Sequence, residues 1–126
     1  AVARRVHLPG FVEERDKAAL ISGADGLLYP SLYEGFGFPI VEAQLCGTPV
    51  LCADSSSLPE VAGAGALLVD ATDTEALATA IERLVTDEGL RSRLVDAGRV
   101  NAQRFTWERA AEQVLSALEA VGNGRR

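Results

Sequence analysis

Residues 34–50 decide the fold of this chain, and they read EGFGFPIVEAQLCGTPV. Pro39 suits the first turn of a helix, because that position needs no amide donor and its fixed φ fits the helix. Gly47, followed by Pro49 two residues later, indicates where the helix stops. The stretch therefore predicts a helix over about 38–46.

Short apolar runs on either side of this helix predict strands, one at 26–30 and one at 49–53. Strand, loop, helix and strand make a βαβ unit, and further strands are expected at 5–8 and 66–70. In open parallel sheets, ligands bind beyond the carboxyl ends of the strands, where the loop over 31–37 would lie. We expect an α/β fold, a Rossmann-like open parallel sheet flanked by helices.

The bend before Phe38 and the two acids beside it fit a ligand that carries both phosphate and hydroxyl groups. A glycine-rich turn that opens a helix presents unpaired backbone N–H groups to an anion. Glu34 and Glu42 can only accept hydrogen bonds, and a carboxylate about 5 Å from a phosphate is repelled by roughly 3 kcal/mol at an effective dielectric of about 20. The acids should therefore face hydroxyls on either side, as in a nucleotide diphosphate sugar.

Plainer interpretations exist for these acids and for the scaffold around them. Glu42 taken alone is a solvated acid favoured by the helix dipole, and Glu34 a turn residue before glycine. Capping boxes of the form S/T-x-x-E predict helix starts at Ser57 and Thr72, while the serines at 55–57 are also candidates for ligand contact.

Two more helices are predicted nearer the C-terminus. One spans about 89–105, and a last one begins at Thr106, a suitable N-cap. Trp107 is expected to pack in the core or between domains.

Composition excludes several classes of protein. The length of 126 residues suits one domain, and the net charge of −6 with a single lysine, Lys17, provides no basic stripe for nucleic acid. No apolar run reaches the ~20 residues of a membrane helix, and no signal peptide opens the chain, so we expect a cytoplasmic protein. His7 and two cysteines offer no metal-ligand spacing, and neither a metal nor a cofactor is expected.

Residues 30–50 resemble the signature of the retaining glycosyltransferases of GT-B architecture known as group 1, which carries two glutamates in this order. The resemblance covers nearly the whole chain. Segments at 8–12, 23–25, 58–63, 66–70 and 105–111 also match the family.

This resemblance implies roles for particular residues. Glu34 would contact the donor sugar and is the catalytic candidate, and Glu42 would hold the ribose hydroxyls. The other donor-binding candidates are three turn residues that offer backbone N–H groups and two residues beside the base: Phe36, Gly37, Phe38, Phe11 and Val12.

The chain also departs from the family pattern. It has neither the Lys or Arg that an earlier strand contributes against the pyrophosphate nor the N-terminal domain that supplies the acceptor site. We therefore expect residues 1–126 to be a single nucleotide-sugar-binding domain, the C-terminal donor-binding part of a transferase without its first strands. Its partners would be the donor and the N-terminal domain of the same protein, and alone it would not transfer.

The expected activity is transfer of a hexosyl group from a nucleotide diphosphate sugar with retention of configuration. Glu13 and Glu14 follow the base segment and suit the N–H donors of guanine, which favours GDP-mannose, although exposed acids explain them equally well. Two alternatives are a nucleotide-sugar-binding module without catalysis and a nucleotide-sugar epimerase, which needs no acceptor.

Overall fold

A computed structural model describes residues 2–123. Its centre is a parallel sheet in the order β1-β2-β3, in which Leu28 lies opposite Leu51 and Leu51 opposite Leu67. The strands are β1 (Leu27–Tyr29), β2 (Val50–Ala53) and β3 (Ala66–Val69). The helices are α1 (Glu14–Ser22), α2 (Phe38–Cys46), α3 (Leu58–Ala62), α4 (Thr74–Thr86), α5 (Glu88–Ala102) and α6 (Trp107–Asn123), with 3₁₀ turns η1 (Val2–Arg5) and η2 (Gly63–Gly65).

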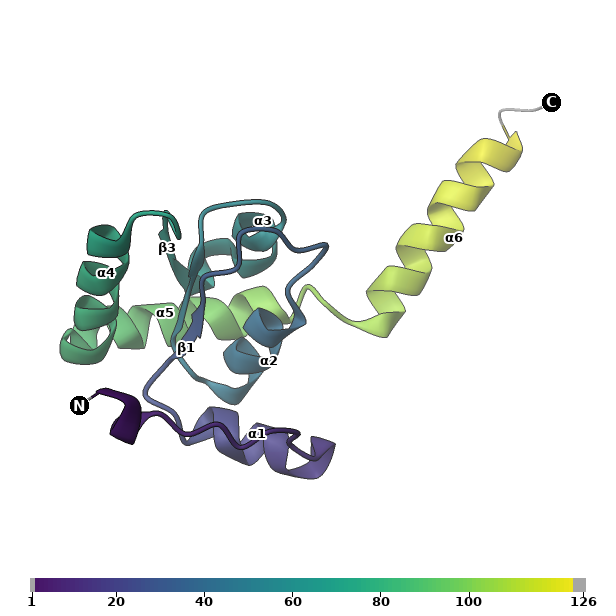
Figure 1. The fold of residues 1–126 in the computed structure, drawn as a ribbon. Coiled ribbons are helices and arrows are strands. Elements are labelled where there is room, and N and C mark those ends of the chain that lie inside the picture. The colour runs from purple at the N-terminus through teal and green to yellow at the C-terminus, as the bar shows by residue number, and fades with distance from the viewer. Residues whose placement is uncertain (1, 124–126) are drawn as a thin grey trace.

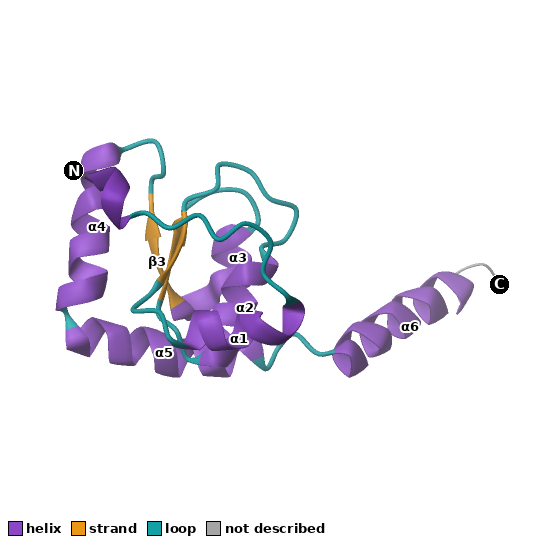
Figure 2. Ribbon diagram, turned by 60° about the horizontal axis from the view of Figure 1, so that its bottom comes forward, coloured by secondary structure: helices purple, strands orange, loops and turns teal. Residues whose placement is uncertain are grey.

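Helices cover both faces of the sheet (Figures 1 and 2). The strand β2 is buried along its whole length. Its unbroken apolar run is typical of a central strand in a parallel sheet, which is covered on both faces. Val50 and Cys52 pack into a cluster with α2 and α3, whereas Leu51 packs with α4 and α5 on the opposite face. The expected α/β architecture is therefore confirmed.

The central helix has the bounds that the sequence predicts. Pro39 lies in its first turn, and Gly47 ends it in the left-handed conformation with φ 74°. Thr48 N–H then donates to the carbonyl of Ala43 at 2.9 Å. This bond satisfies an orphan carbonyl of the last turn.

Buried amides join α2 to α5 and to the end of α3. Asn101 Nδ2 donates to Gln44 Oε1 at 2.8 Å and to the carbonyl of Val61 at 2.8 Å, while Gln44 Nε2 donates to the carbonyl of Ala62 at 2.9 Å. Because buried polar groups are costly when unpaired, this network fixes the helices in one arrangement.

The strand predicted at 5–8 is wrong. The turn η1 ends at Arg5, and the chain then runs without regular structure to α1. Val6 and Leu8 are 55% and 90% exposed. A strand needs a neighbour for its backbone hydrogen bonds, and none of the strands in residues 2–123 pairs with this segment.

Neither predicted capping box forms, although α3 begins directly after Ser57 as the sequence predicts. The helix α4 is capped by Asp73, whose Oδ1 accepts from the amides of Glu75 and Ala76 at 3.0 Å, while Thr72 donates to the carboxylate of Asp70. An ionised carboxylate is the stronger acceptor for helix amides. Ser57 is the N-cap residue of α3, but its hydroxyl donates to the carbonyls of Glu34 and Phe36 and makes no capping hydrogen bond.

The last helix stands away from the rest of the molecule (Figures 1 and 2). Its start is as predicted, since Thr106 Oγ1 accepts from the amide of Arg109 at 3.2 Å. Trp107 is 88% exposed, so packing in the core of this chain is wrong, while packing against another domain stays a prediction. No helix within residues 2–123 is both long and apolar enough to cross a membrane.

Candidate functional site

Three serines after β2 hold the loop that follows β1. Ser57 Oγ donates to the carbonyls of Glu34 and Phe36, at 2.8 and 3.0 Å. Ser56 Oγ donates to the carbonyl of Glu34 at 2.7 Å and accepts from its amide at 3.3 Å, and Ser55 donates to the carbonyl of Leu32 at 3.2 Å. These bonds join the loops at the carboxyl ends of β1 and β2. The sequence analysis predicts that the ligand binds at this edge of the sheet.

The bend leaves three amides without a protein partner, although Gly37 itself is buried. Within residues 2–123, the N–H groups of Phe36, Gly37 and Phe38 donate to no protein acceptor. Gly37 is the N-cap of α2, with φ 106° and no side chain to cap the helix. Bare amides at a helix N-terminus, together with the helix dipole, form a site suited to an anion.

Glu34 lies at this bend with one carboxylate oxygen engaged and is half-buried. Tyr29 Oη donates to its Oε1 at 2.8 Å, and Ser31 Oγ donates to the same atom at 2.9 Å. The hydrogen bond to Glu34 raises the pKa of the Tyr29 hydroxyl, and burial adds to the shift. The phenol is therefore protonated and donates at neutral pH. Because both donors use Oε1, Oε2 of Glu34 can accept from a ligand hydroxyl.

Glu42 lies one turn into α2 and pairs with a residue of α1. Lys17 Nζ lies 2.7 Å from Glu42 Oε1, and it also contacts Glu14 Oε1 at 3.0 Å. The hydrogen bonds to Glu42 and Glu14 raise the pKa of the Lys17 amine. Like Glu34, Glu42 keeps its second oxygen clear of these contacts.

Aromatic rings line the bend. The rings of Phe36 and Phe38 lie 4.8 Å apart, and Phe36 also meets Phe105 edge to face at 5.4 Å. Phe11 and Val12 lie in the irregular segment before α1, where Phe11 is 87% exposed and Val12 is half-buried. The structure thus brings Phe36 and Phe38 together at the bend and leaves Phe11 open to solvent.

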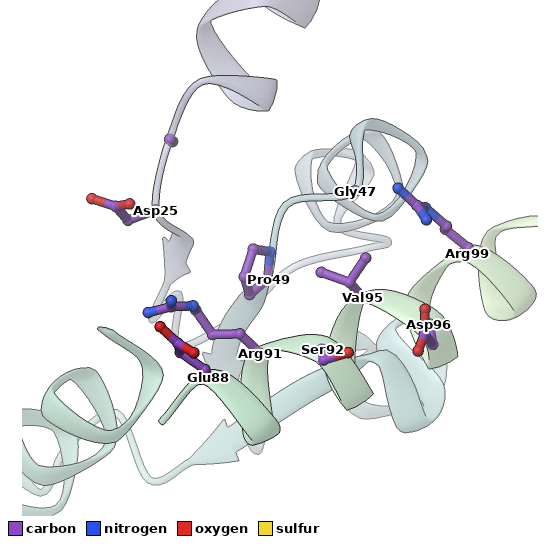
Figure 3. Close-up of a pocket in the computed structure, with 10 residues that line it drawn as sticks. Asp25, Gly47, Pro49, Glu88, Arg91, Ser92, Val95, Asp96 and Arg99 are labelled. Atoms are coloured by element: carbon purple, nitrogen blue, oxygen red, sulfur yellow. The ribbon is translucent and has the colours of Figure 1, made fainter. Parts of the chain in front are cut away.

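A hollow of about 510 Å³ lies at the opposite edge of the sheet (Figure 3). Its lining includes Asp25 and Pro49, which precede β1 and β2, and Arg91 and Arg99 of α5. Because ligands of parallel sheets bind at the carboxyl edge, and because this hollow carries acids as well as arginines, the bend is the stronger candidate site.

Sequence reasoning missed the side chains that orient the two acids. Tyr29 and Ser31 could be suspected from their nearness to Glu34 in the sequence. Lys17 pairs with Glu42, which lies 25 residues away in the sequence. The one local indication that Lys17 forms ion pairs is that it follows Glu14 by three residues.

Comparison with known proteins identifies the family. The chain belongs to the family described as "Glycosyl transferases group 1", whose model matches residues 2–101. It is 39% identical over 112 residues to O-antigen chain mannosyltransferase B of Escherichia coli, covering 89% of this chain and 29% of the relative. It is 36% identical over 118 residues to MMP alpha-(1->4)-mannosyltransferase of Mycolicibacterium hassiacum, covering 90% of this chain and 29% of that protein.

Solved structures agree with this assignment. Sucrose-phosphate synthase from Thermosynechococcus elongatus superposes with a TM-score of 0.84 at 32% identity, over 98% of this chain and 32% of that one. Anabaena HepE, in complex with UDP and glucose, gives a TM-score of 0.70 at 27% identity, over 79% of this chain and 28% of that one. The fold matches GT-B glycosyltransferase structures, and the chain spans about 29% of the two mannosyltransferases.

Proposed function

We propose that this chain forms the donor side of a glycosyltransferase site that transfers a hexosyl group from a nucleotide diphosphate sugar with retention. The observation that carries this proposal is the bend before α2, where three successive amides donate to no protein acceptor and are flanked in the sequence by two half-buried acids, Glu34 and Glu42. An anion and two sets of hydroxyls would be bound side by side there, as a diphosphate flanked by sugar and ribose requires.

In this proposal the amides of Phe36, Gly37 and Phe38 receive the diphosphate. Negative charge grows on the diphosphate as its bond to the sugar breaks, and fixed amide dipoles stabilise that charge without solvent reorganisation. Glu34 orients the sugar through Oε2, and Glu42 accepts from the ribose. Phe11 and Val12 lie beside the base, and an N-terminal domain supplies the acceptor site.

The donor is proposed to be a GDP-hexose, with mannose as the sugar. Glu13 and Glu14 suit guanine, and both relatives named above are mannosyltransferases. The bound UDP and glucose of HepE make UDP-glucose the competing donor. Isothermal titration with UDP, GDP and their sugars separates the two donors. Formation of an isomeric nucleotide sugar from donor alone would point to the epimerase, which needs no acceptor.

The central test is Glu34→Gln in the complete protein that contains this chain. We expect transfer to fall roughly a hundredfold to a thousandfold, as when a preorganised group at the reacting centre is lost, with the melting temperature nearly unchanged. Glu82→Gln, an exposed acid of α4, should behave as the wild type. Near-normal turnover of Glu34→Gln would remove Glu34 from the mechanism. We expect residues 1–126 alone to bind donor without transferring.

A further inference from the structure

The contact between Lys17 and Glu42 joins two parts of the proposed donor site. Lys17 lies on α1, directly after the segment with Phe11 and Val12, and Glu42 lies on α2. Their atoms are 2.7 Å apart, and the two side chains are only 34% and 33% exposed. The second partner of Lys17, Glu14, is 86% exposed.

No residue of α1 is fully buried, and its partly buried Ile21, near the C-terminal end, packs against the core. The second half of α1 is held by Thr48, which donates to the carbonyl of Ile21 at 2.7 Å, and more weakly by Cys46 at the carbonyl of Ala18. Within residues 2–123, the first turn of α1 has one side-chain hydrogen bond to another element, and Lys17 makes it.

The pairing is also directional. Lys17 occupies Oε1 of Glu42 and no other atom of that carboxylate, which leaves Oε2 for a ligand. A glutamate side chain has three rotatable bonds, and a fixed partner on one oxygen selects the orientation of the other. Removing the ammonium would free the carboxylate to adopt other orientations.

We propose that Lys17 is a positioning residue for the donor: it holds Glu42 toward the ribose hydroxyls. This inference rests on the proposed function. An ordinary exposed ion pair contributes little, so the proposal requires an effect on ribose recognition that a purely structural contact would not produce.

The test compares nucleoside diphosphates with and without ribose hydroxyls. In the complete protein, the dissociation constants of GDP and UDP are measured beside those of their 2′,3′-dideoxy forms. We expect the wild type to prefer the better ribonucleotide over its dideoxy form by roughly tenfold or more. Lys17→Met should weaken ribonucleotide binding by about the same factor and leave binding of the dideoxy form nearly unchanged, so that the preference for the ribonucleotide is lost. Lys17→Arg should retain most of the preference.

Two controls separate positioning from general effects. Arg15→Met removes the same charge from the same helix at a side chain that is 84% exposed, and it should keep the wild-type preference. In a Glu42→Gln background, Lys17→Met should add no further loss, since Lys17 acts through Glu42.

The outcomes distinguish this inference from the proposed function. If folded Lys17→Met keeps the preference for the ribonucleotide, or binds both forms more weakly by the same factor, the positioning role is overturned. The proposed donor site is not affected by that result. If the wild type binds neither diphosphate, or shows no preference for ribose, the proposed role of Glu42 fails and the role of Lys17 fails with it.

Discussion

Tyr29 donates a hydrogen bond of 2.8 Å to Oε1 of Glu34. Because Tyr29 is the last residue of β1, the sheet helps to set the direction of the Glu34 carboxylate. Sites supported by regular elements hold their geometry better than sites built on loops alone. Ser31 adds a second donor to the same oxygen, and the opposite oxygen is left for the ligand.

Tyr29→Phe in the complete protein should lower kcat by roughly tenfold, the usual worth of a hydrogen bond to a charged group. The donor KM should change less, because Ser31 still contacts Glu34. Tyr33→Phe is the matched control, since Tyr33 precedes Glu34 and is 83% exposed. Steady-state kinetics of the two variants test the claim, and equal rates for both would exclude a role for the Tyr29 hydroxyl.

Gly37→Ala should lower the free energy of unfolding by about 1–3 kcal/mol and distort the backbone of the bend. Gly37 has φ 106°, and a Cβ there would lie 2.8 Å from Leu58 Cδ2. Gly35→Ala provides the comparison, because a Cβ at Gly35 meets nothing within 4 Å. Urea unfolding measures both variants, and equal losses of stability would show that the conformation of Gly37 is not required.

Gln44→Leu should cost about 2–4 kcal/mol of unfolding free energy. The leucine would leave the carbonyl of Ala62 without its donor and one bond of Asn101 unmade. Gln113→Leu on the exposed helix α6 should change stability by less than about 0.5 kcal/mol. Thermal or urea unfolding distinguishes the two, and a neutral Gln44→Leu would mean that the amide network adds no stability.

The two cysteines should differ in reactivity. Burial, with a smaller contribution from Asp54, raises the pKa of the Cys52 thiol to about 11, so at pH 8 only about one molecule in a thousand carries the thiolate. Cys46 is half-buried. Iodoacetamide at pH 8 should modify Cys46 in the folded chain and Cys52 only after unfolding. Mass spectrometry locates the label, and rapid native labelling of Cys52 would contradict its burial in β2.

The sequence correctly predicted the features that neighbouring residues set. Pro39 and Gly47 fix the start and end of α2 through backbone geometry within a few residues, and the apolar runs predict the three strands of the sheet. The prediction of a strand at 5–8 was wrong for a physical reason. Polar and apolar residues alternate there, but a strand forms only where another strand pairs with its backbone hydrogen-bonding groups.

For the site, the sequence by itself determined the bend and the two acids beside it, because these lie within nine consecutive residues. Only the tertiary structure decided which distant side chains contact Glu34 and Glu42. Ser57 reaches the carbonyl of Glu34 across 23 residues, and Lys17 reaches Glu42 across 25. Such pairs depend on how α1 packs on α2 and on where β2 ends beside β1. Helix spacing predicts neighbours within one turn, whereas these contacts follow from the packing of whole elements.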